Sequence, residues 1–432
     1  MRSVFCKEKI TIGWLCLLAL VLAAGRVRAQ HTDRLLEDLL KKSPELFGRV
    51  LADPAKYDVQ ILYTQINRDD QNHPSFRTFR YRVDKDRYFY PASTVKLPAV
   101  LMALEKINRL KKKDDRLQAL TRYSPMLTDS AYAGQTAVRT DTSDVDRMPS
   151  VAQYAKKILM VSDNDAFNRL YEFIGPCELN DGLYEKGYRD LRIVHRLSIP
   201  LTAEQNRRTN PVRFVNRRPD GTQEVLYEQP MQICDRSYRP EQPIRRGTGF
   251  MRGDSLIRRP FDFTEKNFLS LEDQQEMLRA VLFPEAVSAR KQFDLTPDDY
   301  GFLYQYLSQL PRESRHPGYD TSYYDSYCKF LMFGDTKSRM PASIRIFNKV
   351  GDAYGYLIDN AYIVDFDRNV EFLLSAVIYC NEDGIFNDDK YDYQTVGFPF
   401  LANLGRIIFD YEVKRKRPVT PDLSRFRVRY DP

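Results

Sequence analysis

Strand-like patterns stand at both ends of this 432-residue chain, and helical patterns fill its middle. Near the start, residues 58–66 and 76–83 alternate apolar and polar side chains around a polar turn, which predicts an antiparallel hairpin. Near the end, residues 343–349, 360–366 and 370–379 are β-rich runs joined by turns. These runs predict one sheet built from both ends of the chain, with a helical domain inserted between them.

Helical periodicity predicts the remaining elements. Leucines at helical spacing predict an amphipathic helix over residues 33–51, and a longer apolar stripe predicts a helix that begins at Ser93. Pro149-Ser150 opens a further helix, and another runs from Asp165 to Ile174 before Gly175-Pro176. A closing helix is expected over about residues 393–411.

The segment Ser93-Thr94-Val95-Lys96 lies at the start of the first long helical pattern. Residues three apart there share a face, so the Lys96 amine can lie beside the Ser93 hydroxyl. A serine becomes a nucleophile when a neighbouring base takes its proton, and a desolvated lysine with a lowered pKa can do so. The helix amino terminus adds N–H groups that stabilise an oxyanion. The simpler interpretation is an N-cap serine followed by an exposed lysine.

Ser162-Asp163-Asn164 also has two compatible interpretations. In the simpler one, Asp163 or Asn164 caps the following helix. In the catalytic one, the Ser162 hydroxyl relays a proton to the leaving nitrogen, while the Asn164 amide holds a substrate carbonyl and contacts Lys96.

Lys349-Val350-Gly351 closes a predicted strand, and an ordinary strand end with a glycine turn explains it most simply. Alternatively, Lys349 holds the Ser162 hydroxyl in place and attracts a substrate carboxylate. Gly351 would then let substrate lie close to the strand edge. The backbone N–H of Asp352 would be the second oxyanion donor, beside that of Ser93.

In this order, the three segments resemble the S-x-x-K, S-D-N and K-T-G motifs of serine β-lactamases and penicillin-binding proteins. Tyr90-Pro91-Ala92, residues 157–161 and residues 355–360 also resemble the class A β-lactamase family, and the likeness covers most of residues 35–205 and 265–412. The resemblance implies an α+β fold of the β-lactamase/transpeptidase type. In that fold, an all-helical domain packs on a five-stranded antiparallel sheet flanked by helices, with the site between them. It implies neither a metal nor an organic cofactor.

Two departures from the family pattern affect binding and size. Val350 stands where the family usually has Thr or Ser, so a hydroxyl that helps to bind the antibiotic carboxylate is missing. The interval between Ser162 and Lys349 is longer than in compact members. This length fits an insertion at about residues 205–262, which has the composition of a lid-like excursion or of a mobile linker.

A third departure concerns the glutamate that positions the deacylating water. Glu204 is the nearest candidate after Asn164, with Asn206 or Asn210 as partners of the water. The local pattern matches the family's poorly, and a surface glutamate fits it equally well. Without this base, the same site would acylate and stall.

The amino terminus predicts a secretory signal peptide over residues 1–29. Basic residues precede an apolar run over residues 10–24, and Val27-Arg28-Ala29 has the form of a cleavage site. An uncleaved anchor is the alternative, although the run is short for a bilayer span. Removing this segment lowers the formal net charge from +7 to +3, which argues against nucleic acid as a partner. We therefore expect an exported protein, periplasmic or secreted.

Four cysteines remain after the predicted cleavage, and two disulfides among them would allow three connectivities. They are Cys177, Cys234, Cys328 and Cys380. In an oxidising compartment one or two disulfides are expected. The four histidines are scattered, so we predict neither a zinc site nor a Ser-His-Asp triad.

The predicted organisation is a discontinuous sheet domain (residues 30–92 and 311–432) and a helical domain (residues 93–310) that carries the insertion. We expect a monomeric, exported serine hydrolase that opens β-lactam amides through an acyl-enzyme on Ser93. Its partner would be a small-molecule β-lactam or a peptidoglycan-like peptide. A D,D-peptidase or esterase that deacylates slowly is the first alternative. The second is a non-enzymatic envelope binding or sensor module with a degenerate site.

Overall fold

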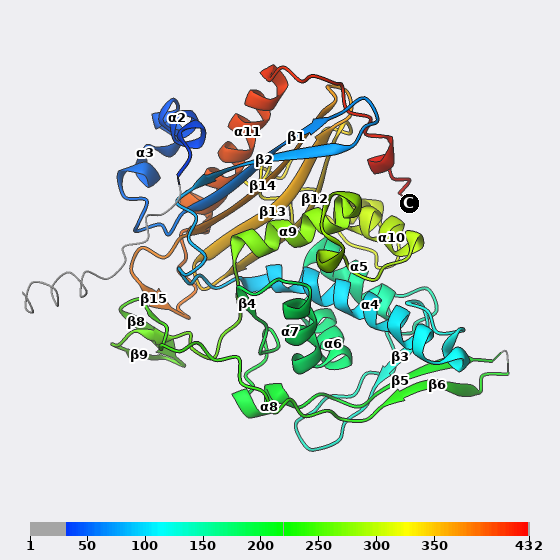
Figure 1. Cartoon of the computed structure of the whole chain (residues 1–432). Helices are drawn as coiled ribbons and strands as arrows, with labels where there is room; N and C mark the ends of the chain where they lie inside the picture. Colours follow the sequence, from blue (N-terminus) through cyan, green and yellow to red (C-terminus); the bar gives the residue numbers. More distant parts are fainter. Residues whose placement is uncertain (1–31, 219, 431–432) are drawn as a thin grey trace, which may run out of the picture.

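A five-stranded antiparallel sheet organises the chain (Figure 1). The computed structural model describes residues 32–218 and 220–430, so the predicted signal peptide lies outside the described residues. The sheet order is β12-β13-β14-β1-β2. Its strands are β1 (Gln60–Arg68), β2 (Pro74–Tyr81), β12 (Ile344–Ala353), β13 (Tyr356–Asp365) and β14 (Val370–Tyr379). Gln60 of β1 pairs with Val377 of β14, which confirms one sheet built from both ends of the chain.

Helices cover both faces of this sheet (Figure 1). β14 is buried along nearly all of its length, so its sequence is mostly apolar on both faces rather than alternating, with Glu371 and Ser375 as buried polar exceptions. Phe372 and Leu374 join one apolar core, and Leu373 between them joins the other, because successive side chains point to opposite faces. The covering helices are α2 (Arg34–Lys41), α3 (Pro44–Ala52), α9 (Leu271–Leu282), α10 (Pro297–Ser308) and α11 (Phe398–Lys414).

The helical part is built around α4 (Lys96–Lys113), which packs against three other helices. These are α5 (Val151–Val161), α6 (Asn164–Ile174) and α7 (Pro176–Glu185). Residues 96–107 of α4 are buried on every side, which identifies it as the central helix. Ser150 caps α5 through its side chain, and Gly175 at φ 86° separates α6 from α7. The predicted start of α5 and both predicted ends of α6 are confirmed to within one residue.

Two predicted boundaries were wrong. The expected helix over residues 33–51 is two helices, because Pro44 lacks the N–H that a continuous helix needs and instead begins α3. The expected turn after Lys349 lies further along, because β12 continues through Gly351 to Ala353 and pairs there with β13. The third motif is therefore inside a strand.

The segment over residues 205–262 forms small sheets with the rest of the chain. β5 and β6 form a hairpin that pairs with β3, and β8 and β9 pair with β15. A disulfide joins Cys177 to Cys234, while Cys328 and Cys380 are free and buried. The remaining elements are α8 (Ala203–Arg207), β3 (Met126–Thr128), β4 (Leu191–Arg192), β5 (Val212–Arg217), β6 (Gln223–Gln229), β7 (Arg245–Arg246), β8 (Gly249–Arg252), β9 (Ser255–Ile257), β10 (Phe261–Asp262), β11 (Phe268–Leu269) and β15 (Ile385–Phe386).

Among the helices of residues 32–218 and 220–430, none has the length and apolar character needed to cross a bilayer.

Candidate active site

Ser93 lies in a 3₁₀ turn (Ala92–Val95) that leads directly into α4. From Tyr88 to Ile107 it is the only residue that is not buried, so its side chain alone in this stretch reaches solvent. Ala92, immediately before it, has a left-handed φ of 49°, which is unfavourable for a residue with a Cβ. Such backbone strain persists where the surrounding structure enforces it, and it is frequent at functional sites.

Lys96, one turn after Ser93, is completely buried and faces the second motif. Its Nζ donates to the Asn164 Oδ1 at 2.7 Å and to the Ser162 carbonyl oxygen at 2.5 Å. Burial, reinforced by the nearby positive charge of Lys349, holds the pKa of Lys96 well below its ordinary value. The neutral amine is thus favoured, and a neutral amine can accept a proton.

The second motif turns sharply between two helices, and this turn presents its side chains. Ser162 ends α5 at a left-handed φ of 62°, and Asp163 caps α6 by accepting the Ala166 N–H at 2.8 Å. Because Asp163 supplies the cap, the side chains of Ser162 and Asn164 are free to meet Lys96. The helix cap by Asp163 and the contact of Asn164 with Lys96 are both confirmed, and the catalytic roles of Ser162 and Asn164 stay predictions.

Lys349 approaches the Ser162 hydroxyl from the sheet side. Its Nζ donates to the Ser162 Oγ at 2.8 Å, and the Lys96 Nζ lies 3.3 Å from the same oxygen. The Ser162 hydroxyl therefore lies between two amines that come from different parts of the fold. Burial also lowers the pKa of Lys349, whose side chain is 2% exposed.

Gly351 allows β12 to touch the turn that carries Ser93. A Cβ placed on Gly351 would lie 2.7 Å from the Pro91 carbonyl oxygen and 3.0 Å from the Ser93 nitrogen, closer than side chains pack. Because β12 is an edge strand of the five-stranded sheet, alternate N–H groups on it face away from β13. The assignment of the Asp352 N–H as an oxyanion donor stays a prediction.

All three motifs line one cavity of about 920 Å³. Ser93, Ser162 and Asn164 contribute from the helical side, and Val350 and Asp352 contribute from β12. Much of the remaining wall is aromatic, supplied by Tyr90, Phe261, Tyr324, Tyr327, Phe330, Tyr354, Tyr391 and Phe398. An open cavity with an apolar wall and a few convergent polar groups has the character of a small-molecule site.

Comparison with known families identifies the chain's relatives. The model of the beta-lactamase enzyme family matches residues 49–411. The chain belongs to this family. A search among curated proteins finds no match.

Solved β-lactamase structures resemble this fold at low identity. The β-lactamase from Sphaerobacter thermophilus aligns over 88% of this chain and 98% of its own, with 12% identity and a TM-score of 0.45. The β-lactamase from Xanthomonas campestris pv. campestris aligns over 88% and 99%, with 14% identity and a TM-score of 0.45. The β-lactamase from Burkholderia phymatum aligns over 88% and 100%, with 13% identity and a TM-score of 0.45.

Glu204 is not among the residues that line the cavity of Ser93. It lies in the first turn of α8, its side chain is 73% exposed, and it forms an ion pair with Arg208 at 2.6 Å. The predicted water partners also have other contacts. Asn206 accepts the Arg196 N–H at 2.9 Å, and Asn210 donates to the Asp129 carbonyl at 2.8 Å.

The carboxylates that line the Ser93 cavity are Asp352 and Asp389. Ser93 and Ser162 thus line one cavity with Lys96 buried against Ser162, while Glu204 does not line this cavity. Within the described ranges, no cluster of three or more His, Cys, Asp or Glu side chains could hold a metal ion.

Several cavity residues were missed by the sequence reasoning. Asn164 Nδ2 donates to the Ser198 Oγ at 2.8 Å, which links the second motif to the segment after β4. Cys328 is buried behind the lysines, where burial raises the pKa of its thiol to about 11. The tyrosine-rich runs at residues 323–327 and 391–393 were a visible signal, since adjacent aromatics often mark a binding wall.

Proposed function

We propose that this chain is a serine hydrolase of the β-lactamase type that opens amide bonds of β-lactams through an acyl-enzyme on Ser93. The contact of the buried Lys96 amine with Ser162 and Asn164, one helical turn after the partly exposed Ser93, carries the proposal. A lysine kept neutral by burial beside a serine that reaches the cavity is the arrangement that nucleophilic attack requires.

The proposed acylation moves one proton along this chain of groups. Lys96 takes the proton of the Ser93 hydroxyl as its oxygen attacks the substrate carbonyl carbon. The Ser93 and Asp352 N–H groups bind the oxyanion, and Asn164 and Lys349 orient the substrate. Collapse of the tetrahedral intermediate breaks the C–N bond. Ser162 gives its proton to the leaving nitrogen and takes the proton held by Lys96, which leaves an ester on Ser93.

Deacylation separates two candidate activities on this site. With a base for the hydrolytic water, for which Glu204 is our proposal, the ester is cleared and β-lactams are consumed. The exposed position of Glu204 and its ion pair with Arg208 favour a second candidate, a D,D-peptidase or esterase that β-lactams acylate persistently. Both candidates share the acylation step, and they differ in the lifetime of the ester.

An intact-mass time course with a penicillin tests the proposal. We expect an adduct of the penicillin's full mass on the wild-type protein and none on Ser93→Ala. An adduct that forms and clears while the penicillin is consumed supports the β-lactamase. A persistent adduct supports the slow second candidate. If no β-lactam leaves an adduct and none is consumed, the chain acts on other esters or amides or serves as a binding module, and the proposal is wrong.

We further propose that the protein is exported and acts as a monomer on β-lactams or peptidoglycan-like peptides. The Cys177–Cys234 disulfide supports export, because such bonds persist mainly in oxidising compartments.

A further inference from the structure

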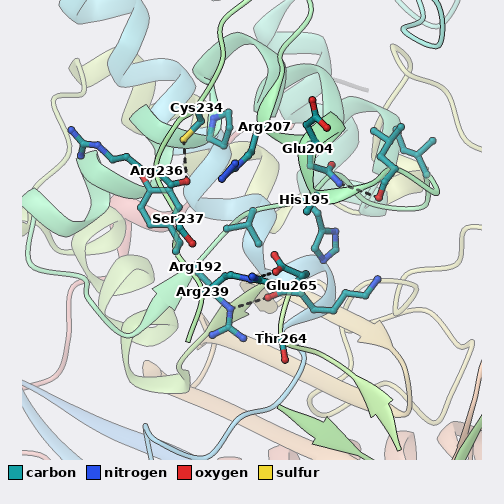
Figure 2. Close-up of a pocket in the computed structure, with 18 of the residues that line it drawn as sticks. Arg192, His195, Glu204, Arg207, Cys234, Arg236, Ser237, Arg239, Thr264 and Glu265 are labelled. Carbon is teal, nitrogen blue, oxygen red and sulfur yellow. Dashed lines mark hydrogen bonds and ion pairs between the residues drawn. The ribbon is translucent and has the colours of Figure 1, made fainter. Parts of the chain in front are cut away.

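A second cavity of about 440 Å³, whose lining residues Figure 2 shows, adjoins the active-site cavity. Four residues, His195, Ile199, Pro200 and Lys266, line both cavities, so the segment after β4 forms a shared wall. The second cavity is otherwise lined by Pro176, by Arg192, Val194 and Leu201, by α8, and by parts of residues 234–239 and 264–265. None of the three sequence motifs reaches it.

This second cavity carries an excess of positive charge. Five cationic residues line it, Arg192, Arg207, Arg236, Arg239 and Lys266, against two carboxylates, Glu204 and Glu265. Both carboxylates already have partners: Glu204 pairs with Arg208, and Glu265 pairs with Arg239. Arg236 pairs with Asp181. Among the described residues, Arg192, Arg207 and Lys266 therefore have no carboxylate partner.

Arg192 is the buried cation of this group. The residue is 7% exposed, and its guanidinium lies over the Tyr88 ring at 5.4 Å and the Phe268 ring at 5.6 Å. Its Nε donates to the Lys266 carbonyl at 3.0 Å, but its buried Nη2 has no hydrogen-bond partner in the described part of the chain. A buried cationic donor without a partner is costly, and an anion would offset that cost.

A disulfide, a side-chain hydrogen bond and a strand pairing hold parts of the cavity wall in place. The Cys177–Cys234 disulfide attaches the start of residues 234–239 to α7. Tyr238 donates its hydroxyl to the Asp181 Oδ1 at 2.9 Å, which attaches the same segment a second time. Arg192 itself lies in β4, opposite Phe268 of β11. Arg192 and the segment over residues 234–239 are thus fixed before a ligand arrives, which lowers the entropic cost of binding.

We propose that this cavity binds a carboxylate or phosphate group of a small anionic ligand, with Arg192 and Arg207 as the residues that hold it. A guanidinium donates two parallel N–H bonds to such groups, which matches both the charge and the geometry of the site. The group belongs either to the far end of a substrate that reaches Ser93 or to a separate ligand, because the two cavities share a wall.

Isothermal titration with inorganic phosphate and with citrate, at low ionic strength, tests the proposal. We expect Arg207→Ala to weaken binding about tenfold, the loss of one charge-assisted hydrogen bond. Arg192→Lys keeps the charge but loses the planar fork, so it is also expected to bind more weakly. Arg217→Ala, an exposed arginine on the β5–β6 hairpin outside the cavity, is the matched control and should bind like wild type. Thermal unfolding confirms that each variant folds.

The proposal is wrong if wild type binds neither probe at millimolar concentration, or if Arg207→Ala and Arg192→Lys both bind like wild type. Repeating the titration on Ser93→Ala keeps this result independent of any chemistry at Ser93. The rate of Ser93 acylation by a penicillin, measured with and without saturating phosphate, distinguishes the two sources of the anionic group. Slower acylation supports a group on the substrate, and unchanged acylation supports a separate ligand.

Discussion

At the scale of single residues, the candidate site depends on two amines that share one hydroxyl. Lys96 and Lys349 both lie within 3.3 Å of the Ser162 Oγ, so two positive charges there would repel each other. Burial and the proximity of Lys349 depress the pKa of Lys96. Burial therefore favours the neutral amine of Lys96, which is the form that the proposed proton transfer from Ser93 requires.

The rate of Ser93 acylation should depend on pH in a definite direction. The reactive neutral form of Lys96 exists above its pKa in the folded protein, so the rate should fall as pH drops through that value. Because the pKa is lowered, the fall should lie well below the ordinary lysine range. Intact-mass rates across pH, with thermal unfolding at each pH as the control, check this. A rate that rises on acidification would contradict the role of Lys96.

Gly351→Ala should impair the site more than the fold. The added Cβ meets the Pro91 carbonyl and the Ser93 nitrogen, so β12 and the serine turn must separate. We expect a loss of about 1–3 kcal/mol in the free energy of unfolding, the usual cost of overpacking, and at least a tenfold slower acylation. Gly301→Ala in α10 is the control, because its Cβ would meet nothing within 4 Å. Acylation by Gly351→Ala at the wild-type rate would refute this reasoning.

At the scale of elements, α6 holds the segment that separates the two cavities. Glu172 of α6 accepts hydrogen bonds from Arg169 at 3.0 Å and from Arg196 at 2.9 Å, and all three residues are buried. Arg196 also donates to the Arg208 carbonyl at 2.9 Å. The buried carboxylate therefore holds Arg196, and the Arg196 guanidinium in turn holds the other end of residues 196–208.

Glu172→Gln should destabilise this segment strongly, because it leaves the buried Arg196 guanidinium without a carboxylate and leaves Arg169 with Asp165 alone. We expect a loss of about 3–5 kcal/mol in the free energy of unfolding, together with faster amide exchange over residues 195–208. Glu224→Gln is the control: its ion pair with Arg218 is exposed, so its loss should cost under about 1 kcal/mol. Equal effects of the two substitutions would show that the buried pairing contributes little.

Local signals explain which elements were predictable from the sequence. Ser150 and Asp163 cap their helices through their own side chains, so the starts of α5 and α6 could be read from a few residues. The path of residues 195–262 could not, because the pairing of β8 with β15 and the contact of Asn164 with Ser198 join distant segments. Glu204 shows the same limit. The cap of its helix α8 is local, but the direction of the Glu204 carboxylate depends on contacts between distant segments, so the sequence did not predict it.

At the scale of the whole molecule, the disulfide closes a loop of 57 residues around the β5–β6 hairpin. Removing it in Cys177→Ser/Cys234→Ser should lower the free energy of unfolding by about 4 kcal/mol, mainly through a freer unfolded chain. Denaturant unfolding of the variant and of wild type, with and without a reductant, measures this. Wild type in reductant should match the variant. Equal stability of all samples would mean that this bond adds nothing.

The pairing of β1 with β14 also has a consequence for synthesis. Ser93 and Lys96 leave the ribosome early. Lys349 and β14, the later strand that pairs with β1, are made more than 200 residues afterwards. A nascent chain therefore carries the β1–β2 hairpin without the strand that pairs with β1, and Ser93 without Lys349, until most of the chain has been made. A chain that stops before β12 lacks both, so labelling of Ser93 by a β-lactam is expected to count molecules that extend past them.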